Sequence, residues 1–176
     1  MKKITSIIAI VTVSLVFSAT ASAQVSANAP TTATIVKPIG ITKNTDMHFG
    51  NVAVSSTAGT VLMTASLTPT RTASGGVTLP KTASGTPTAA KFTVTGQGTY
   101  TYEITVPETA FTLDEDGEGT DTMTVDAFTS TPSATGTLAA DGTEIVYVGA
   151  TLNVKASQVA GAYSNATGFV VTVNYN

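Results

Sequence analysis

Apolar and polar residues alternate in short runs along the chain, and the most regular run ends it. The last eight residues have a period of two, which predicts a half-buried β-strand. The residues on its more apolar face are Phe169, Val171, Val173 and Tyr175. Because chain ends usually fray, a terminal strand of this regularity requires a hydrogen-bonded neighbour.

Shorter runs with the same alternation are separated by Gly, Pro, Asn and Asp. The first predicted strand covers residues 35–42 and is interrupted by Pro38, which indicates an edge or a bulge. The segment 74–76 (Ser-Gly-Gly) predicts a turn before Val77. The runs 90–94 and 100–106 flank a short Gly-Gln-Gly loop, and together they predict a β-hairpin.

Beyond the first 23 residues, no window keeps the period of about 3.6 that a helix requires. Roughly seven to ten short strands separated by turns predict an all-β antiparallel sandwich. We find no internal repeat of fixed length.

The N-terminal region has the pattern of a secretory signal peptide. Lys2 and Lys3 precede a largely apolar stretch, and residues 21–23 (Ala-Ser-Ala) form a small-residue cleavage site. We therefore predict a signal peptide over residues 1–23 and an extended arm over residues 24–34. The β-sandwich domain is predicted for residues 35–176.

Composition excludes several functional classes. The predicted leader carries two of the eight basic residues and none of the eleven acidic ones, so the exported part has a formal charge of −5. No basic cluster is present, which argues against nucleic-acid binding. The absence of cysteine excludes thiol catalysis and cysteine-ligated metals.

Two groups of polar residues are candidate sites of chemistry. His48 is the single histidine, and Asp46 stands two residues away, but no G-x-S-x-G motif accompanies them. Asp114, Asp116 and Glu118 could bind calcium from a Gly-rich loop. Val125 occupies the position of the bidentate Glu of an EF-hand, so a solvated loop is favoured. No metal, cofactor or enzyme activity is predicted.

Tyr100 and Tyr102 alternate with Ile104 on one face of a predicted strand. Such a stripe can stack on a sugar, but it more often packs in a core or across strands. Core packing is therefore the favoured interpretation.

The two ends of the predicted domain resemble a known family. Residues 33–43 and 46–50 resemble the opening of a bacterial domain-of-unknown-function family of secreted, pilin-like β-proteins. Residues 161–163 and 169–175 resemble the end of that family. The chain is also similar to spore-coat-U-type and chaperone–usher pilin subunits, which end in an alternating strand with a penultimate Tyr.

This resemblance implies an immunoglobulin-like β-sandwich that lacks one strand, and a function as a structural subunit of a surface fibre. A periplasmic chaperone and an outer-membrane usher would assist assembly, and like subunits would join head to tail by donor-strand complementation. The expected location is the periplasm in transit and then the cell surface. The donor face would be Val25, Ala27 and Ala29, and the groove edge would be Phe169, Val171, Val173 and Tyr175.

A self-complete secreted binding or adhesion module is the alternative. The cysteine pair of many chaperone–usher subunits is absent. In addition, Val25, Ala27 and Ala29 would each bury little apolar area.

Overall fold

The computed structural model describes residues 23–117 and 119–176, so the predicted signal peptide lies outside the described residues except for Ala23. Within these ranges the chain forms eleven β-strands. None of the described residues belongs to a helix long and apolar enough to cross a membrane. The strands are β1 (Gly40–Thr45), β2 (Ala53–Met63), β3 (Arg71–Thr78), β4 (Ala90–Thr95), β5 (Thr101–Thr105), β6 (Phe111–Glu115), β7 (Thr122–Thr131), β8 (Thr135–Thr137), β9 (Thr143–Val154), β10 (Tyr163–Ser164) and β11 (Thr172–Tyr175).

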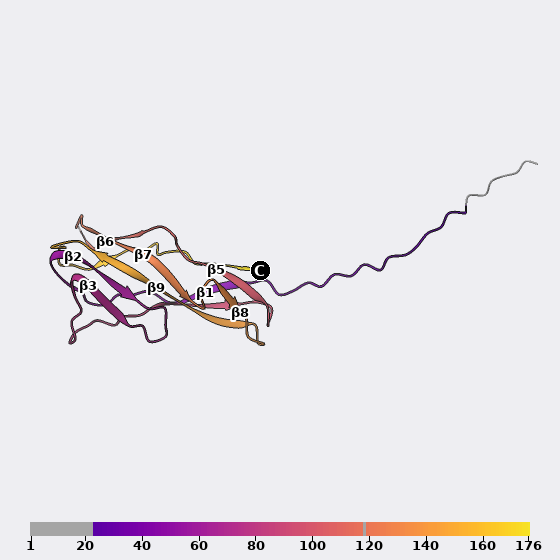
Figure 1. The fold of residues 1–176 in the computed structure, drawn as a ribbon, viewed down its shortest axis with the longest axis horizontal. Coiled ribbons are helices and arrows are strands. Elements are labelled where there is room, and N and C mark those ends of the chain that lie inside the picture. Colours follow the sequence, from indigo (N-terminus) through magenta and orange to yellow (C-terminus); the bar gives the residue numbers. More distant parts are fainter. Residues whose placement is uncertain (1–22, 118) are drawn as a thin grey trace, which may run out of the picture. The chain divides into compact units, whose positions relative to one another are not determined.

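The strands form two antiparallel sheets. The larger sheet has eight strands in the order β1-β4-β9-β7-β6-β10, with β2 added to β9 and β3 added to β2 (Figure 1). The smaller sheet has three strands in the order β11-β5-β8. The prediction of an all-β antiparallel sandwich is confirmed.

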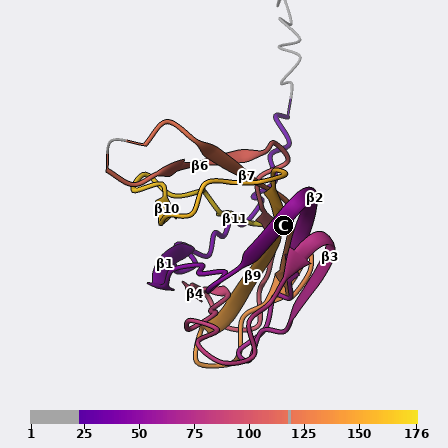
Figure 2. The same ribbon diagram turned by 90° about the vertical axis from the view of Figure 1, so that its left-hand side faces the viewer.

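The central strand of the larger sheet is β9. It pairs with β7 on one side, and with first β4 and then β2 on the other. Figure 2 shows β9 between the β1–β4 pair and the β2–β3 pair. Its alternate residues Val146, Val148, Ala150, Leu152 and Val154 are all buried, as a period-two strand with one covered face requires.

The predicted hairpin between residues 90–94 and 100–106 is wrong. β4 pairs with β1 and β9 in the larger sheet, whereas β5 pairs with β8 and β11 in the smaller sheet. The intervening loop crosses from one sheet to the other, and the amide of Gly96 donates to the carbonyl of Gly142 (2.9 Å). The alternation marked both strands correctly, but it did not identify their partners.

Two other boundaries differ from the prediction. Residues 74–76 form no turn, because they lie within β3, where Gly75 pairs with Gly59 of β2. A Cβ on Gly76 would lie only 1.9 Å from the Thr57 carbonyl oxygen, so glycine permits this close pairing. The first strand begins at Gly40 rather than at residue 35, just beyond Pro38, which cannot donate to a ladder.

The folded unit comprises residues 35–176. Residues 23–34, which include the predicted arm, form no strand and are exposed.

Candidate functional site

The C-terminal strand presents one face to the core and one to solvent. Val171 and Val173 are each only 8% exposed, whereas Thr172 and Asn174 are exposed. The strand itself starts at Thr172, three residues later than predicted, although the alternation of faces already begins at Phe169. Val171 and Val173 therefore belong to the hydrophobic core.

The hydrogen-bond pattern shows which backbone groups of β11 do not pair with β5. The amide of Asn176 donates to the carbonyl of Thr101 (3.3 Å), and the same register pairs Thr172 with Thr105. Because hydrogen-bonded pairs alternate along an antiparallel ladder, the N–H and C=O groups of Val173 and Tyr175 point away from β5. β11 is one of the two outermost strands of its sheet, with β8 at the other end, so these groups form an open edge in the described part of the molecule.

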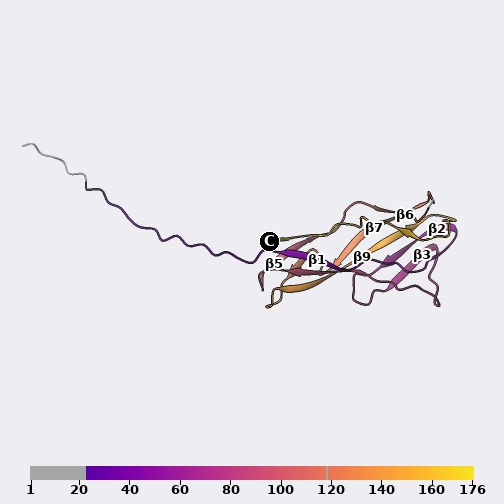
Figure 3. The same ribbon diagram turned by 180° about the vertical axis from the view of Figure 1, so that it is seen from behind.

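A second open edge lies beside the first. β1 is an outermost strand of the larger sheet, and it contacts β11. Figures 1 and 3 both show β1 beside the C-terminal end of the chain. The β1 edge is protected by exposed Lys43 and by a register shift between Lys43 and Thr45. β11 has neither lysine nor proline, so its edge is the better one for an added strand.

Phe169 anchors the segment that enters β11. Its ring packs against three other phenylalanine rings, with centroid distances of 6.4 Å to Phe92, 6.3 Å to Phe111 and 4.9 Å to Phe128. A hollow of about 270 Å³ lies between residues 165–169 and the neighbouring parts of β1 and β4.

Tyr175 fixes the other end of this segment. Its hydroxyl accepts a hydrogen bond from the backbone N–H of Gln97 (2.6 Å) and donates one to the backbone carbonyl of Lys37 (2.7 Å). Its ring packs edge-on against Tyr100, at a centroid distance of 5.7 Å. The penultimate Tyr therefore joins β11 to the loop after β4 and to the segment that enters β1.

The acidic loop has local hydrogen bonds of its own. Asp116 accepts from the Ser164 hydroxyl, and its amide donates to the Ala162 carbonyl (2.8 Å). Asp114 is an exposed residue of β6, and Glu118 lies outside the described residues. In the ranges that the structure describes, no three His, Cys, Asp or Glu side chains are grouped to hold a metal ion.

His48 and Asp46 have separate partners. The Nδ1 atom of His48 accepts from the amide of Gly50 (2.8 Å), and the His48 backbone pairs with Thr88. The carboxylate of Asp46 forms an ion pair with Lys43. His48 is therefore an exposed residue in an isolated β-bridge.

Tyr102 is a core residue, as favoured. It is fully buried in β5, and its hydroxyl donates to a carboxylate oxygen of Glu144 in β9 (2.8 Å), which links the two sheets. Burial, and secondly the neighbouring Glu144, raise the pKa of Tyr102 well above its ordinary value. Sequence reasoning missed Glu144, because nothing local indicates a partner 42 positions away.

The extent of the sandwich coincides with that of a known family. A family model described as "Domain of unknown function (DUF4402)" matches residues 39–175. The chain belongs to the DUF4402 family. The DUF4402 match begins one residue before β1 and ends with the last residue of β11, so it includes the edges of β1 and β11 and Tyr175. No curated protein and no solved structure matches the sequence significantly.

Proposed function

We propose that this DUF4402 protein is a structural subunit of a bacterial surface fibre, joined head to tail by strand addition between copies. The observation that carries the proposal is the open edge of β11, whose inward side chain Val173, together with Val171 just before the strand, already belongs to the core. A strand added there would gain main-chain hydrogen bonds from Val173 and Tyr175. The pilin-like ending of the sequence supports the same function.

The proposed donor is the arm of a neighbouring copy, residues 24–34. Val25, Ala27 and Ala29 alternate with polar residues, and all three are exposed. In an added strand these side chains would share one face, and that face would lie against the edge of the receiving subunit's hydrophobic core beside β11. Because donor and acceptor are different surfaces, each copy can join a further one, and an open fibre results.

Export would precede assembly in this proposal. The signal peptide directs the chain to the periplasm, where a chaperone and an outer-membrane usher hold and pass on the subunit. The fibre then forms at the cell surface. No catalytic activity and no cofactor are part of the proposal.

A matched pair of arm variants tests strand addition. Ala27→Asp places a charge on the proposed inserted face, whereas Ser26→Asp places the same charge on the opposite face. We expect wild type and Ser26→Asp to form a ladder of polymers on an unboiled gel, and Ala27→Asp to remain monomeric. Equal ladders for both variants, or a ladder from a protein lacking residues 24–34, would show that the arm is not the donor.

One observation favours a self-complete binding module as a second candidate. Val171 and Val173 are each 8% exposed without any added strand. A module of this kind would run as a single low band in the wild-type lane of the same gel. A synthetic peptide of residues 24–34 would leave its unfolding midpoint unchanged.

A further inference from the structure

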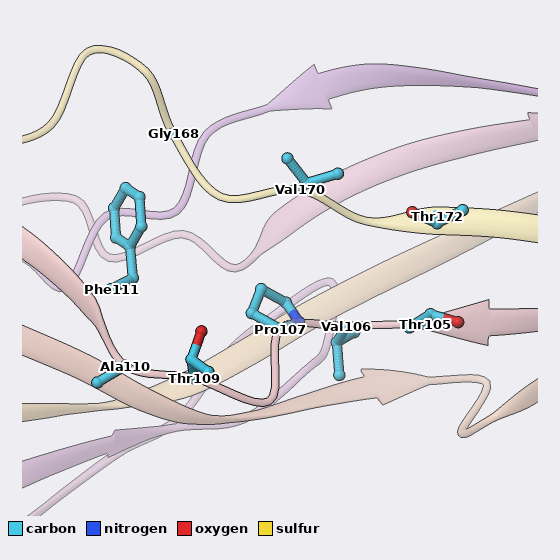
Figure 4. Close-up of a pocket in the computed structure, with 9 residues that line it drawn as sticks. All are labelled: Thr105, Val106, Pro107, Thr109, Ala110, Phe111, Gly168, Val170 and Thr172. Carbon is cyan, nitrogen blue, oxygen red and sulfur yellow. The ribbon is translucent and has the colours of Figure 1, made fainter.

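The smaller sheet divides at one end into two separate segments. Thr105 and Thr172 form the last pair between β5 and β11, and the next hydrogen-bonding pair in that register would be Pro107 with Val170. Proline has no N–H group, so the ladder cannot continue through this position. A hollow of about 360 Å³ lies where residues 105–111 diverge from residues 168–172 (Figure 4).

The lining of this hollow combines apolar groups with hydroxyls. Figure 4 shows Pro107, Thr109 and Phe111 projecting toward the 168–172 segment, whereas Val106 points away from it. Val170 on the opposite side is 73% exposed. Small-ligand sites are commonly apolar hollows of about 300–1,000 Å³ with a few polar groups that orient the ligand. This hollow is open to solvent, its volume lies within that range, and its lining is mixed.

The polar groups at the hollow are uncharged. Every second residue of an antiparallel strand directs its backbone N–H and C=O groups toward the same neighbouring strand. Thr172 directs these groups toward Thr105, so Val170, two residues earlier, directs its own toward the gap left by Pro107. The hydroxyls of Thr105, Thr109 and Thr172 can each donate and accept. A ligand with mixed neutral donors and acceptors would satisfy these groups.

The outer face of the smaller sheet extends this polar surface. Register places Thr101 beside Thr137, and Asn174 beside Glu103, and all four are exposed. Successive outward residues on one strand are about 7 Å apart, so the face presents regularly spaced polar groups next to the hollow. Glu103 is the one charged residue on these strands' outer face, and no lysine or arginine accompanies it. This charge disfavours anionic ligands.

We propose that the hollow and the adjoining face bind a neutral oligosaccharide that carries N-acetyl groups. The acetyl methyl group would pack against Pro107 and Phe111, and the acetamido group would hydrogen-bond to the backbone of Val170. Hydroxyls of the following sugar units would pair with Thr105, Thr172 and the threonines beyond them. This activity goes beyond fibre assembly and is independent of it.

Calorimetric titration of the purified exported protein tests this site. The probe is the linear tetramer of N-acetylglucosamine, and the comparison ligand is the glucose tetramer with the same linkage. We expect the N-acetylated tetramer to bind wild type at least about tenfold more tightly than the glucose tetramer, which corresponds to about 1.4 kcal/mol. No binding of the N-acetylated tetramer, or equal binding of both, overturns the assignment.

Two tryptophan variants locate the binding. Thr109→Trp fills the hollow from an exposed position, and Thr82→Trp adds the same side chain at an exposed loop residue that does not line it. We expect Thr109→Trp to lose binding and Thr82→Trp to keep it, with both variants unfolding near the wild-type midpoint. Unchanged binding by Thr109→Trp would overturn the site. The Ala27→Asp variant should still bind the tetramer. The binding test can therefore fail while the fibre proposal holds, and the fibre proposal can fail while the binding site holds.

Discussion

The hydroxyl of Tyr175 donates a hydrogen bond to the backbone carbonyl of Lys37, at a distance of 2.7 Å. These residues are 138 positions apart, and the contact joins the last strand to the segment that enters the first. The same hydroxyl accepts from the amide of Gln97 (2.6 Å). One oxygen atom therefore fixes three segments at the border where both sheets have an open edge.

Replacement of Tyr175 by Phe should lower the free energy of unfolding by about 1–3 kcal/mol, because two hydrogen bonds are lost and the Gln97 amide loses its partner. Urea unfolding measures the change. Tyr100→Phe is the matched control: it keeps the ring contact with Tyr175, and the Tyr100 hydroxyl forms no hydrogen bond with the described residues. Equal effects of the two substitutions would contradict the function assigned to the Tyr175 hydroxyl.

Phe169→Ala tests whether the phenylalanine cluster holds the segment that enters β11. Phe169 is half-buried, so we expect a loss of about 2 kcal/mol, below the roughly 3–5 kcal/mol of a fully buried Phe. Its neighbour Val170 points outward, and Val170→Ala should change stability by less than about 0.5 kcal/mol. Thermal or urea unfolding of both variants compares the inward and the outward face of this segment. A larger loss of stability from Val170→Ala than from Phe169→Ala would show that Val170, not Phe169, holds the segment.

Much of the fold was predictable because a period of two identifies the buried face of a strand. Val171 and Val173 were placed on the inner face from sequence alone, and both are buried. The missing period of about 3.6 and the many turn residues likewise indicated short strands rather than helices.

The choice of partner strand was not predictable from alternation. The residues of β4 and β5 alternate equally well for a hairpin and for a crossing between two sheets, and local pattern does not distinguish these arrangements. Long-range contacts decide it: the Leu138 amide donates to the Tyr100 carbonyl (3.0 Å), and Gly96 bonds to Gly142. The predicted run 100–106 stops just before Pro107, but the hollow beside this proline also depends on Val170, 63 positions later.

Tyr102 should make stability depend on pH in the alkaline range. Burial, and secondly Glu144, raise its pKa in the folded protein above the ordinary value of about 10. The stabilisation is therefore complete below about pH 10, and it is lost as the pH rises from there toward the folded pKa. The free energy of unfolding should fall by up to about 1.4 kcal/mol per pH unit from this group.

Urea unfolding between about pH 8 and pH 11 measures this slope. Tyr102→Phe should be less stable than wild type near neutral pH, by about 1–3 kcal/mol, because Glu144 loses its hydrogen-bond donor. Above about pH 10 its stability should fall less steeply than that of wild type. Glu144→Gln should retain most of the wild-type slope, since burial is the larger cause of the raised pKa of Tyr102. A Tyr102→Phe protein with the full wild-type slope would show that another group titrates in this range.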